Sequence, residues 1–196
     1  MPSTKEMVNF YWHCGVVTHL IQRFPPKTAP KSDTRFAIRK ATEALTGKNG
    51  VAYASVAARQ AKALNGNRWE RCGLVREHAI PVGHIYQQVV SALGAKRTGA
   101  SLARARQRLD AEMKILPVEA GDFDGFPDDP HIAFVAAVIR ASTVMAWLTT
   151  KEDDLLKAKL GDGSESLNKR MPPGWDGVDP LARYRYCQID VQPVTT

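Results

Sequence analysis

The chain has 196 residues, of which 44% are hydrophobic and 24% charged, a composition typical of a globular protein with a core large enough to fold without a disulfide or metal. Its three cysteines lie far apart, which argues against a disulfide framework, and no apolar run reaches the ~20 residues that a membrane span needs. We therefore expect a cytoplasmic protein with reduced thiols.

The net charge of +7 is distributed unevenly along the chain. Residues 1–110 contain 18 Lys and Arg against 6 Asp and Glu, a net charge of +12, whereas residues 111–196 contain 9 against 14, a net charge of −5. This polarity predicts that the first half of the chain meets a polyanion, either nucleic acid or an acidic protein partner. A basic surface that is only solvated would give the same counts.

Apolar periodicity and capping residues predict four helices in the first half of the chain. They cover residues 32–47, 51–66, 81–94 and 101–116. The first two end in glycine, the third begins at a proline, and the fourth ends just before one. We interpret residues 75–80, which precede the third helix, as a turn.

The second half predicts two further helices around a short strand. Asp129 is placed to cap a helix that has Pro130 as its first residue. The β-branched and aromatic run 142–149 predicts a buried strand. Thr149 and Glu152 then form the T-x-x-E pattern of a capping box at the start of the next helix.

The last 36 residues predict an arm rich in glycine and proline. A short helix over residues 180–186 and a strand over 187–194 would close it. Trp175 and one tyrosine are expected to anchor the arm to the core, although aromatics interleaved with arginine can also stack on bases or on a peptide.

These elements predict a mainly α fold, or an α+β fold with a small sheet, with six to seven helices and two or three short strands. We expect residues 1–160 to form a single mainly helical domain with a basic first half. Residues 161–196 would form the arm with its short helix and closing strand.

The stretch around residue 77 holds the strongest catalytic pattern. Glu77-His78-x-x-Pro81 resembles the first strand of the HNH (ββα-metal) nucleases, in which the histidine activates water against a phosphodiester and a divalent ion stabilises the leaving oxygen. The resemblance implies catalytic roles for Glu77 and His78, and Arg76 beside them is a third candidate catalytic residue. The hairpin and the Asn- and His-bearing helix that follow in that family have no counterpart here, so we assign no membership. A structural alternative is that Glu77 pairs with Arg76 or Arg71 at a turn.

Other metal-binding patterns fail on spacing or on secondary structure. Two Cys/His sets lack the tight knuckle of zinc sites: Cys72 with His78 and His84, and His13 with Cys14 and His19. An EF-hand counted from Asp122 places Ala133 where a glutamate is required. The E-x-K triplet Glu112–Lys114 of restriction-type nucleases falls in a helical pattern rather than on a strand. A divalent metal is therefore expected only if the nuclease hypothesis holds.

Basic side chains of residues 30–110 give the leading hypothesis, a nucleic-acid-binding surface built on helices. The predicted contacts are Arg35, Arg39, Lys40, Arg59, Lys62, Lys96, Arg97, Arg104 and Arg108. Two alternatives remain open. One is a metal-dependent nuclease that uses Glu77 and His78, and the other is a basic inhibitor or interaction protein that binds an acidic protein partner.

Overall fold

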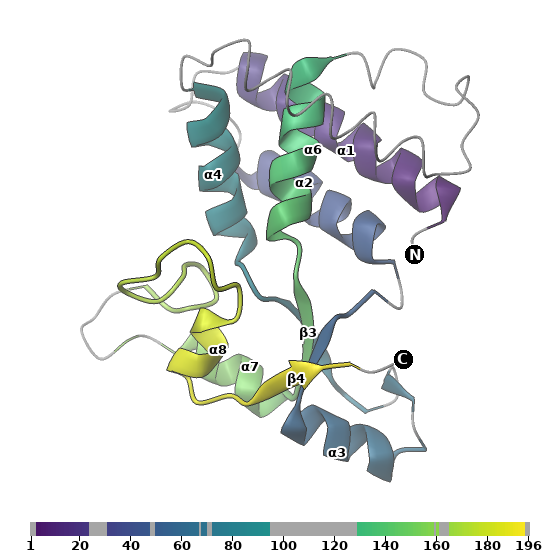
Figure 1. The fold of residues 1–196 in the computed structure, drawn as a ribbon, viewed down its shortest axis with the longest axis vertical. Helices are drawn as coiled ribbons and strands as arrows, with labels where there is room; N and C mark the ends of the chain where they lie inside the picture. The colour runs from purple at the N-terminus through teal and green to yellow at the C-terminus, as the bar shows by residue number, and fades with distance from the viewer. Residues whose placement is uncertain are drawn as a thin grey trace. The chain divides into compact units, whose positions relative to one another are not determined.

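A computed structural model gives the fold in two compact units (Figure 1). It describes residues 3–23, 31–47, 50–66, 68–69, 72–94, 129–158, 160 and 165–194. The helical unit comprises Met1–Lys48 and Ile85–Ser142, and the sheet unit comprises Asn49–His84 and Thr143–Thr196. Seven helices and four strands lie in the described residues, so the mainly α fold with a small sheet is confirmed, with more strands than expected.

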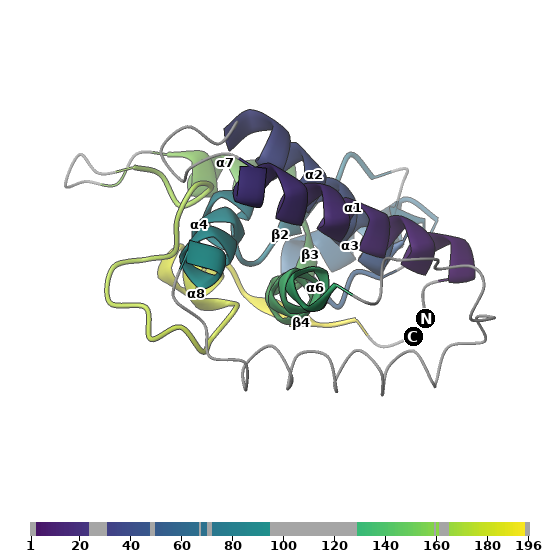
Figure 2. The ribbon, with the colours of Figure 1, turned by 90° about the horizontal axis from the view of Figure 1, so that it is seen from above.

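The helical unit is built on two antiparallel helices, α1 (Thr4–Arg23) and α2 (Lys31–Thr46), which lie side by side in Figures 1 and 2. The start of α1 meets the end of α2, since Glu6 Oε1 lies 2.7 Å from the position that a Cβ would take at Gly47. Gly47 also has a φ of +54°, so the expected glycine stop of α2 is confirmed and needs both the backbone freedom and the space of glycine.

Two more helices complete the helical unit, α4 (Val82–Gly94) from Ile85 onward and α6 (Pro130–Ser142), which packs on α1. Asp129 Oδ1 accepts a hydrogen bond of 2.8 Å from the backbone N–H of His131, so the predicted cap of α6 is confirmed. The larger apolar residues with no exposed surface in the described part of this unit are Phe10, Cys14, Val17, Ile38, Ile85, Val89, Val135 and Ile139. No helix in the described part of the chain is long and apolar enough to cross a membrane.

The sheet unit contains four strands in the order β2-β3-β1-β4. They are β1 (Tyr53–Ser55), β2 (Val75–His78), β3 (Met145–Leu148) and β4 (Val191–Pro193). β3 is parallel to β1 and antiparallel to β2, and β4 is antiparallel to β1. β3 and β4 confirm the two predicted strands.

β2 corrects the prediction of a turn before α4. Its sequence, Val-Arg-Glu-His, has one β-branched residue and three polar ones, so local propensity gives little signal for a strand. The strand forms because β3 provides a partner for each of its four residues. β1 corrects the predicted helix over residues 51–66, because its three residues run directly into α3, which begins at Val56.

Each face of the sheet packs against different helices. The α8 face carries a core of Ala146, Leu148, Leu156, Leu167, Tyr184 and Ile189, which includes residues of α7 (Thr150–Lys157) and α8 (Ala182–Tyr186). The α3 face carries Val51, Ala54, Met145 and Trp147, packed with Ala58 of α3 (Val56–Leu64) and with the partly buried Trp69 and Leu74.

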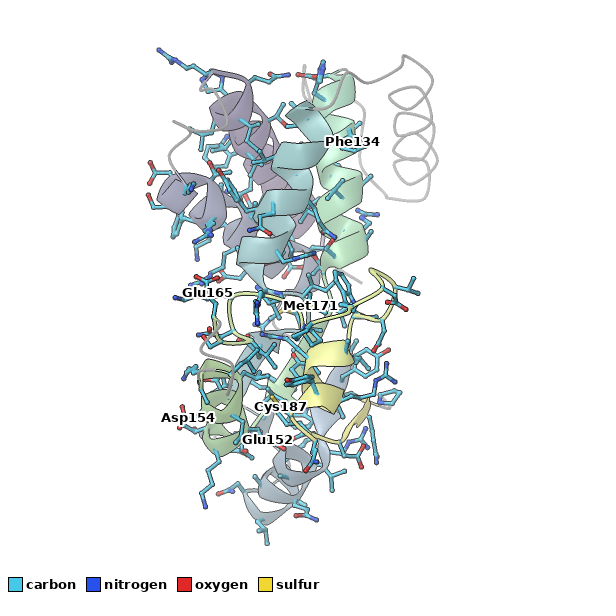
Figure 3. All side chains as sticks on the ribbon, turned by 90° about the vertical axis from the view of Figure 1, so that its left-hand side faces the viewer. Phe134, Glu152, Asp154, Glu165, Met171 and Cys187 are labelled. Carbon is cyan, nitrogen blue, oxygen red and sulfur yellow. The ribbon has the colours of Figure 1, made fainter. Side chains whose placement is uncertain are left out.

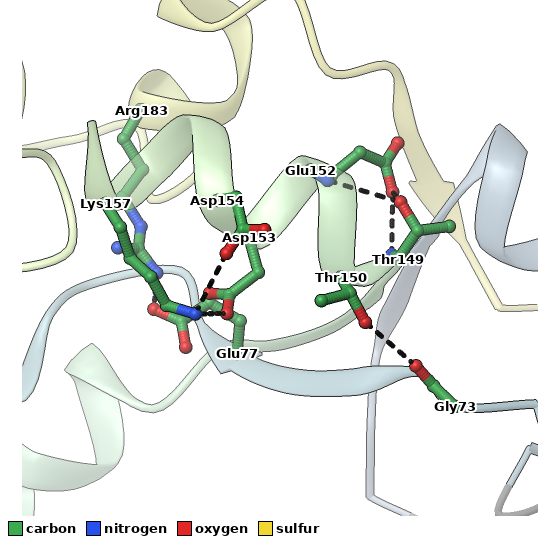
Figure 4. Close-up of polar contacts among 9 residues, drawn as sticks. All are labelled: Gly73, Glu77, Thr149, Thr150, Glu152, Asp153, Asp154, Lys157 and Arg183. Atoms are coloured by element: carbon green, nitrogen blue, oxygen red, sulfur yellow. Dashed lines mark hydrogen bonds and ion pairs between the residues drawn. The ribbon is translucent and has the colours of Figure 1, made fainter.

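A single carboxylate joins the starts of α3 and α7, the helices that follow the parallel strands β1 and β3. Ser55 Oγ accepts from the backbone N–H of Ala58 and donates to Glu152 Oε2 at 2.6 Å. The same Glu152 oxygen accepts from the backbone N–H and the hydroxyl of Thr149, each at 2.8 Å (Figure 4). The predicted capping box of Thr149 and Glu152 is therefore confirmed, and it also fixes where α3 begins.

The C-terminal segment packs into the sheet unit. Leu167 is 1% exposed and Met171 is 6% exposed, and Figure 3 labels Met171 and Cys187 along this part of the chain. Trp175 Nε1 donates a hydrogen bond of 2.7 Å to the carbonyl of Asp179, and Tyr184 is fully buried. The division expected at residue 160 thus falls inside the sheet unit, whose second segment is Thr143–Thr196.

Candidate nucleic-acid interface

The three residues of the catalytic hypothesis follow one another on β2 and point alternately to the two faces of the sheet. Arg76 is opposite Trp147 and lies over its ring, so it belongs to the α3 face. Glu77 is opposite Ala146 and contacts Arg183 of α8, so it belongs to the α8 face. His78 is opposite Met145 of the α3-face core. Glu77 and His78 therefore lie on opposite faces of the sheet, and their joint catalytic role stays a prediction.

Glu77 forms an ion pair with Arg183 on the α8 face (Figure 4). Arg183 has no exposed surface, the Glu77 side chain is 22% exposed, and Arg183 Nη2 lies 2.5 Å from Glu77 Oε1. The guanidinium also donates to the carbonyl of Leu167 at 2.8 Å and to the carbonyl of His78. A buried charge is tolerated only when it is paired and hydrogen-bonded, so these contacts tie β2, α8 and the segment around Leu167 together.

Burial disfavours the charged form of two ionisable side chains close to Arg183, those of Tyr184 and Cys187. It raises the pKa of the Tyr184 hydroxyl far above its ordinary value, and the nearby Arg183 opposes the shift only in part. Burial likewise raises the pKa of the Cys187 thiol, again opposed by Arg183. The carboxylate that forms an ion pair with Arg183 is that of Glu77.

The α3 face carries a continuous row of aromatic and basic contacts. The rings of Trp69 and Trp147 are stacked with centroids 5.7 Å apart and planes inclined by 3°. Lys62 Nζ lies 4.5 Å from the Trp69 ring centroid, and Arg76 Cζ lies 5.9 Å from the Trp147 ring centroid. We call Lys62, Trp69, Trp147 and Arg76 the aromatic–basic row. Contacts of this kind attract a cation to the negative face of the ring without removing its charge.

Secondary structure fixes the position of both cations in the row. The Ser55 cap sets the start of α3, which carries Lys62, and the β2–β3 register places Arg76 directly opposite Trp147. Arg59 lies three residues before Lys62 on α3 and donates to the carbonyl of Pro193 in β4. The row is therefore built on regular elements.

The surroundings of the row are basic. Residues 50–78 contain five Lys and Arg and two Asp and Glu, and one of the two acids is Glu77 on the other face of the sheet. Within the described residues, no carboxylate forms an ion pair with Arg59, Lys62 or Arg68. The positive charge of these side chains is therefore not balanced there by an acidic neighbour.

A second group of predicted cations lies on α2 in the helical unit. Arg35 and Arg39 are exposed and four residues apart, so they share a side of the helix. Arg35 Cζ lies 5.6 Å from the Tyr86 ring centroid. Lys40 Nζ is 2.7 Å from Glu43 Oε2, so its charge is partly compensated.

Several predicted residues lie outside the described part of the chain. These are the contacts Lys96, Arg97, Arg104 and Arg108, together with Glu112–Lys114 and Asp122. Their contribution stays a prediction. Among the described residues, no three His, Cys, Asp or Glu side chains are grouped as metal ligands, and the three cysteines are free thiols.

Sequence reasoning did not predict roles for Trp69 and Trp147 in this site. The position of Trp69 between Arg68 and Arg71, in a basic stretch of the chain, was a sequence signal for a role in binding. No such signal is present in the sequence for Trp147. Its contact with Arg76 depends on the pairing of two strands that are separated by about 70 residues in the sequence.

Comparison with known proteins adds no relationship, since no family model, curated protein or solved structure matches the chain. Function must therefore be inferred from the chemistry of the site.

Proposed function

We propose that the protein binds nucleic acid through the basic side chains of residues 30–110. The observation that carries this proposal is the aromatic–basic row, in which Lys62 and Arg76 rest on stacked tryptophan rings while Arg59 and Arg68 lie in the same segment of the sheet unit. A cation held against a ring keeps its full charge and loses less freedom when it meets a phosphate than a freely moving side chain would.

The expected contacts are to phosphate groups. Trp147 is only 8% exposed, so its ring is not free to stack on a base and instead supports Arg76. Lysine and arginine contacts to phosphate supply affinity without sequence choice and release counterions from the nucleic acid. Binding should therefore weaken steeply as the salt concentration rises.

The test is fluorescence anisotropy with a labelled duplex at low salt, comparing the wild type with Lys62→Ala and Arg76→Ala. Each variant should bind more weakly because one phosphate contact is lost. Lys157→Ala is the matched control: Lys157 belongs to the same unit, but its ammonium is paired with Asp153 at 2.5 Å and with Asp154 at 3.3 Å (Figure 4). Its affinity should equal that of the wild type.

Two results would contradict the proposal. One is a wild type that leaves both duplex and single-stranded probes unbound at low salt, which would direct attention to the acidic protein partner. The other is an equal loss of affinity in Lys157→Ala and Lys62→Ala, which would mean that net charge alone, and not the row, governs binding.

A further inference from the structure

Two large aromatic side chains of the helical unit are left exposed. Trp12 on α1 is 53% exposed, and Phe36 on α2 is 61% exposed. The ring of Trp12 meets the ring of His13 edge to face with centroids 4.9 Å apart, and Lys40 Nζ lies 5.6 Å from the Phe36 ring centroid. Aromatic side chains of this size normally gain more by burial than any other kind, so two of them in water need an explanation.

Trp12 and Phe36 lie on the neighbouring helices α1 and α2, and each ring contacts a basic side chain, His13 and Lys40 respectively. Burial lowers the pKa of His13, the positive charge of Lys40 lowers it further, and Glu43 partly opposes the shift. His13 of α1 thus lies within electrostatic range of Lys40 of α2, in keeping with the side-by-side packing of the two helices (Figure 2). We call Trp12, His13, Phe36 and Lys40 the exposed aromatic surface.

Cations flank this surface. Arg35 and Arg39 are both exposed and stand one residue before and three residues after Phe36 on α2. Within the described residues neither forms an ion pair with a carboxylate. A ligand that suits this surface must therefore present flat apolar faces and negative charges together.

We infer that the exposed aromatic surface binds single-stranded nucleic acid, with unpaired bases stacking on Phe36 and Trp12 and with the backbone phosphates meeting Arg35 and Arg39. The inference rests on the proposed function and narrows it to unpaired strands at this surface. In a duplex the bases are stacked on one another and their faces are not available, whereas in a single strand every base can stack on an aromatic ring.

The test measures the affinity of the full chain for a labelled oligo-dT strand and for a duplex of the same length. Phe36→Ala and Trp12→Ala should each weaken binding of the single strand by roughly five- to hundredfold, the loss expected for one base–aromatic stack, and should leave duplex affinity within about twofold. Phe36→Tyr keeps the aromatic face and should bind like the wild type. Leu64→Ala removes an apolar side chain that is 86% exposed on α3 and serves as the control, with no expected change.

Tryptophan fluorescence gives an independent readout. Bases that stack on Trp12 should quench its emission, so the quenching caused by oligo-dT should be smaller in Trp12→Phe than in the wild type. Equal quenching in the two proteins would overturn the inference. Since both rings are exposed, the substitutions should change the free energy of unfolding by no more than about 0.5 kcal/mol, and a urea titration checks this.

The remaining outcomes separate this inference from the proposed function. Wild-type binding of both probes that Phe36→Ala and Trp12→Ala leave unchanged would overturn base stacking while the proposed function stands. A wild type that binds neither probe would overturn both. A change from dimer to monomer in Phe36→Ala, seen by sedimentation with no loss of oligo-dT affinity, would show that the surface mediates self-association and would also overturn the inference.

Discussion

The two faces of the small sheet use arginine in opposite ways. On the α8 face, Arg183 is fully buried, pairs with Glu77 and donates to two backbone carbonyls. On the α3 face, Arg76 lies over Trp147 in a row that ends at Lys62. Arg76 and Glu77 are neighbours in the sequence, yet strand alternation places Arg76 in the aromatic–basic row and Glu77 beside the buried Arg183.

The difference teaches that a count of basic residues does not measure the charge available to a ligand. A buried guanidinium must be compensated within the protein, because an isolated charge in a low-dielectric interior is too costly. A cation that rests on an aromatic ring at the surface remains charged and accessible to water and phosphate. Arg183 therefore contributes to the fold, whereas the phosphate contacts of the proposed function are assigned to Lys62 and Arg76.

The largest expected effect comes from removing the anion on the α8 face. Glu77→Ala leaves Arg183 buried without its counter-ion and should lower the free energy of unfolding by about 3 kcal/mol in urea titrations. Arg76→Ala changes the adjacent residue on the other face and should cost no more than about 1 kcal/mol. The double variant with Glu77→Ala and Arg183→Met, which removes both charges, should recover part of the loss. Equal losses of unfolding free energy in Glu77→Ala and Arg76→Ala would contradict the difference between the two faces of the sheet.

A smaller effect is expected from removing a ring of the α3 face. Trp69→Ala takes away the surface on which Lys62 rests and should weaken duplex binding by about two- to fivefold, which corresponds to a cation–π contact of ~0.5–1 kcal/mol. Trp175→Ala is the matched control, since Trp175 contacts His84 and the Asp179 carbonyl instead of a cation. Anisotropy measures both, and a loss of affinity in Trp175→Ala as large as in Trp69→Ala would speak against a special role of the row.

The smallest expected effect is the contribution of His84 to the pH dependence of stability. His84 is partly buried, and within the described residues its charged form is not compensated by an ion pair as that of Arg183 is. Burial lowers the pKa of His84 below its ordinary value of 6.5, because the ring packs against Trp175 and its charged form is disfavoured. The folded state therefore binds a proton at His84 less tightly than the unfolded state does. The stability that His84 contributes is present above its ordinary pKa and is lost as the pH falls through its lowered pKa in the folded state.

The measurement is a pair of urea titrations at about pH 7.5 and 5.5. The fall in unfolding free energy between the two pH values should be smaller in His84→Gln than in the wild type. An unchanged or larger fall in the variant would mean that His84 does not contribute to the pH dependence.

Much of the fold could be predicted from local sequence. The Thr149–Glu152 capping box, the Asp129 cap and the Gly47 stop each act within a few residues, so their signals were visible in the sequence and the helices form where they indicate. The buried strand around Trp147 was visible too, through its β-branched and aromatic composition.

The strand β2 and the contacts of Glu77 and Arg183 were not predicted because they depend on distant partners. β2 exists because β3 pairs with it, and the roles of Arg183 and Glu77 follow from a contact between residues 106 positions apart. The sequence predicted that the Arg-Tyr-Arg-Tyr segment either anchors the arm or stacks on a ligand, but it could not show that Arg183 would be one of the most deeply buried side chains. The predicted cations Arg59 and Lys62 were visible by charge, whereas the tryptophan rings beside Lys62 were not.

The most direct test of the account is the salt dependence of duplex binding by the wild type and by the double variant with Lys62→Ala and Arg76→Ala. The logarithm of affinity should fall linearly with the logarithm of salt concentration, and the double variant should reduce the slope by about two because two phosphate contacts are lost. The Lys157→Ala slope should equal that of the wild type. A double variant whose slope matches the wild type would contradict the claim that these two cations bind phosphate.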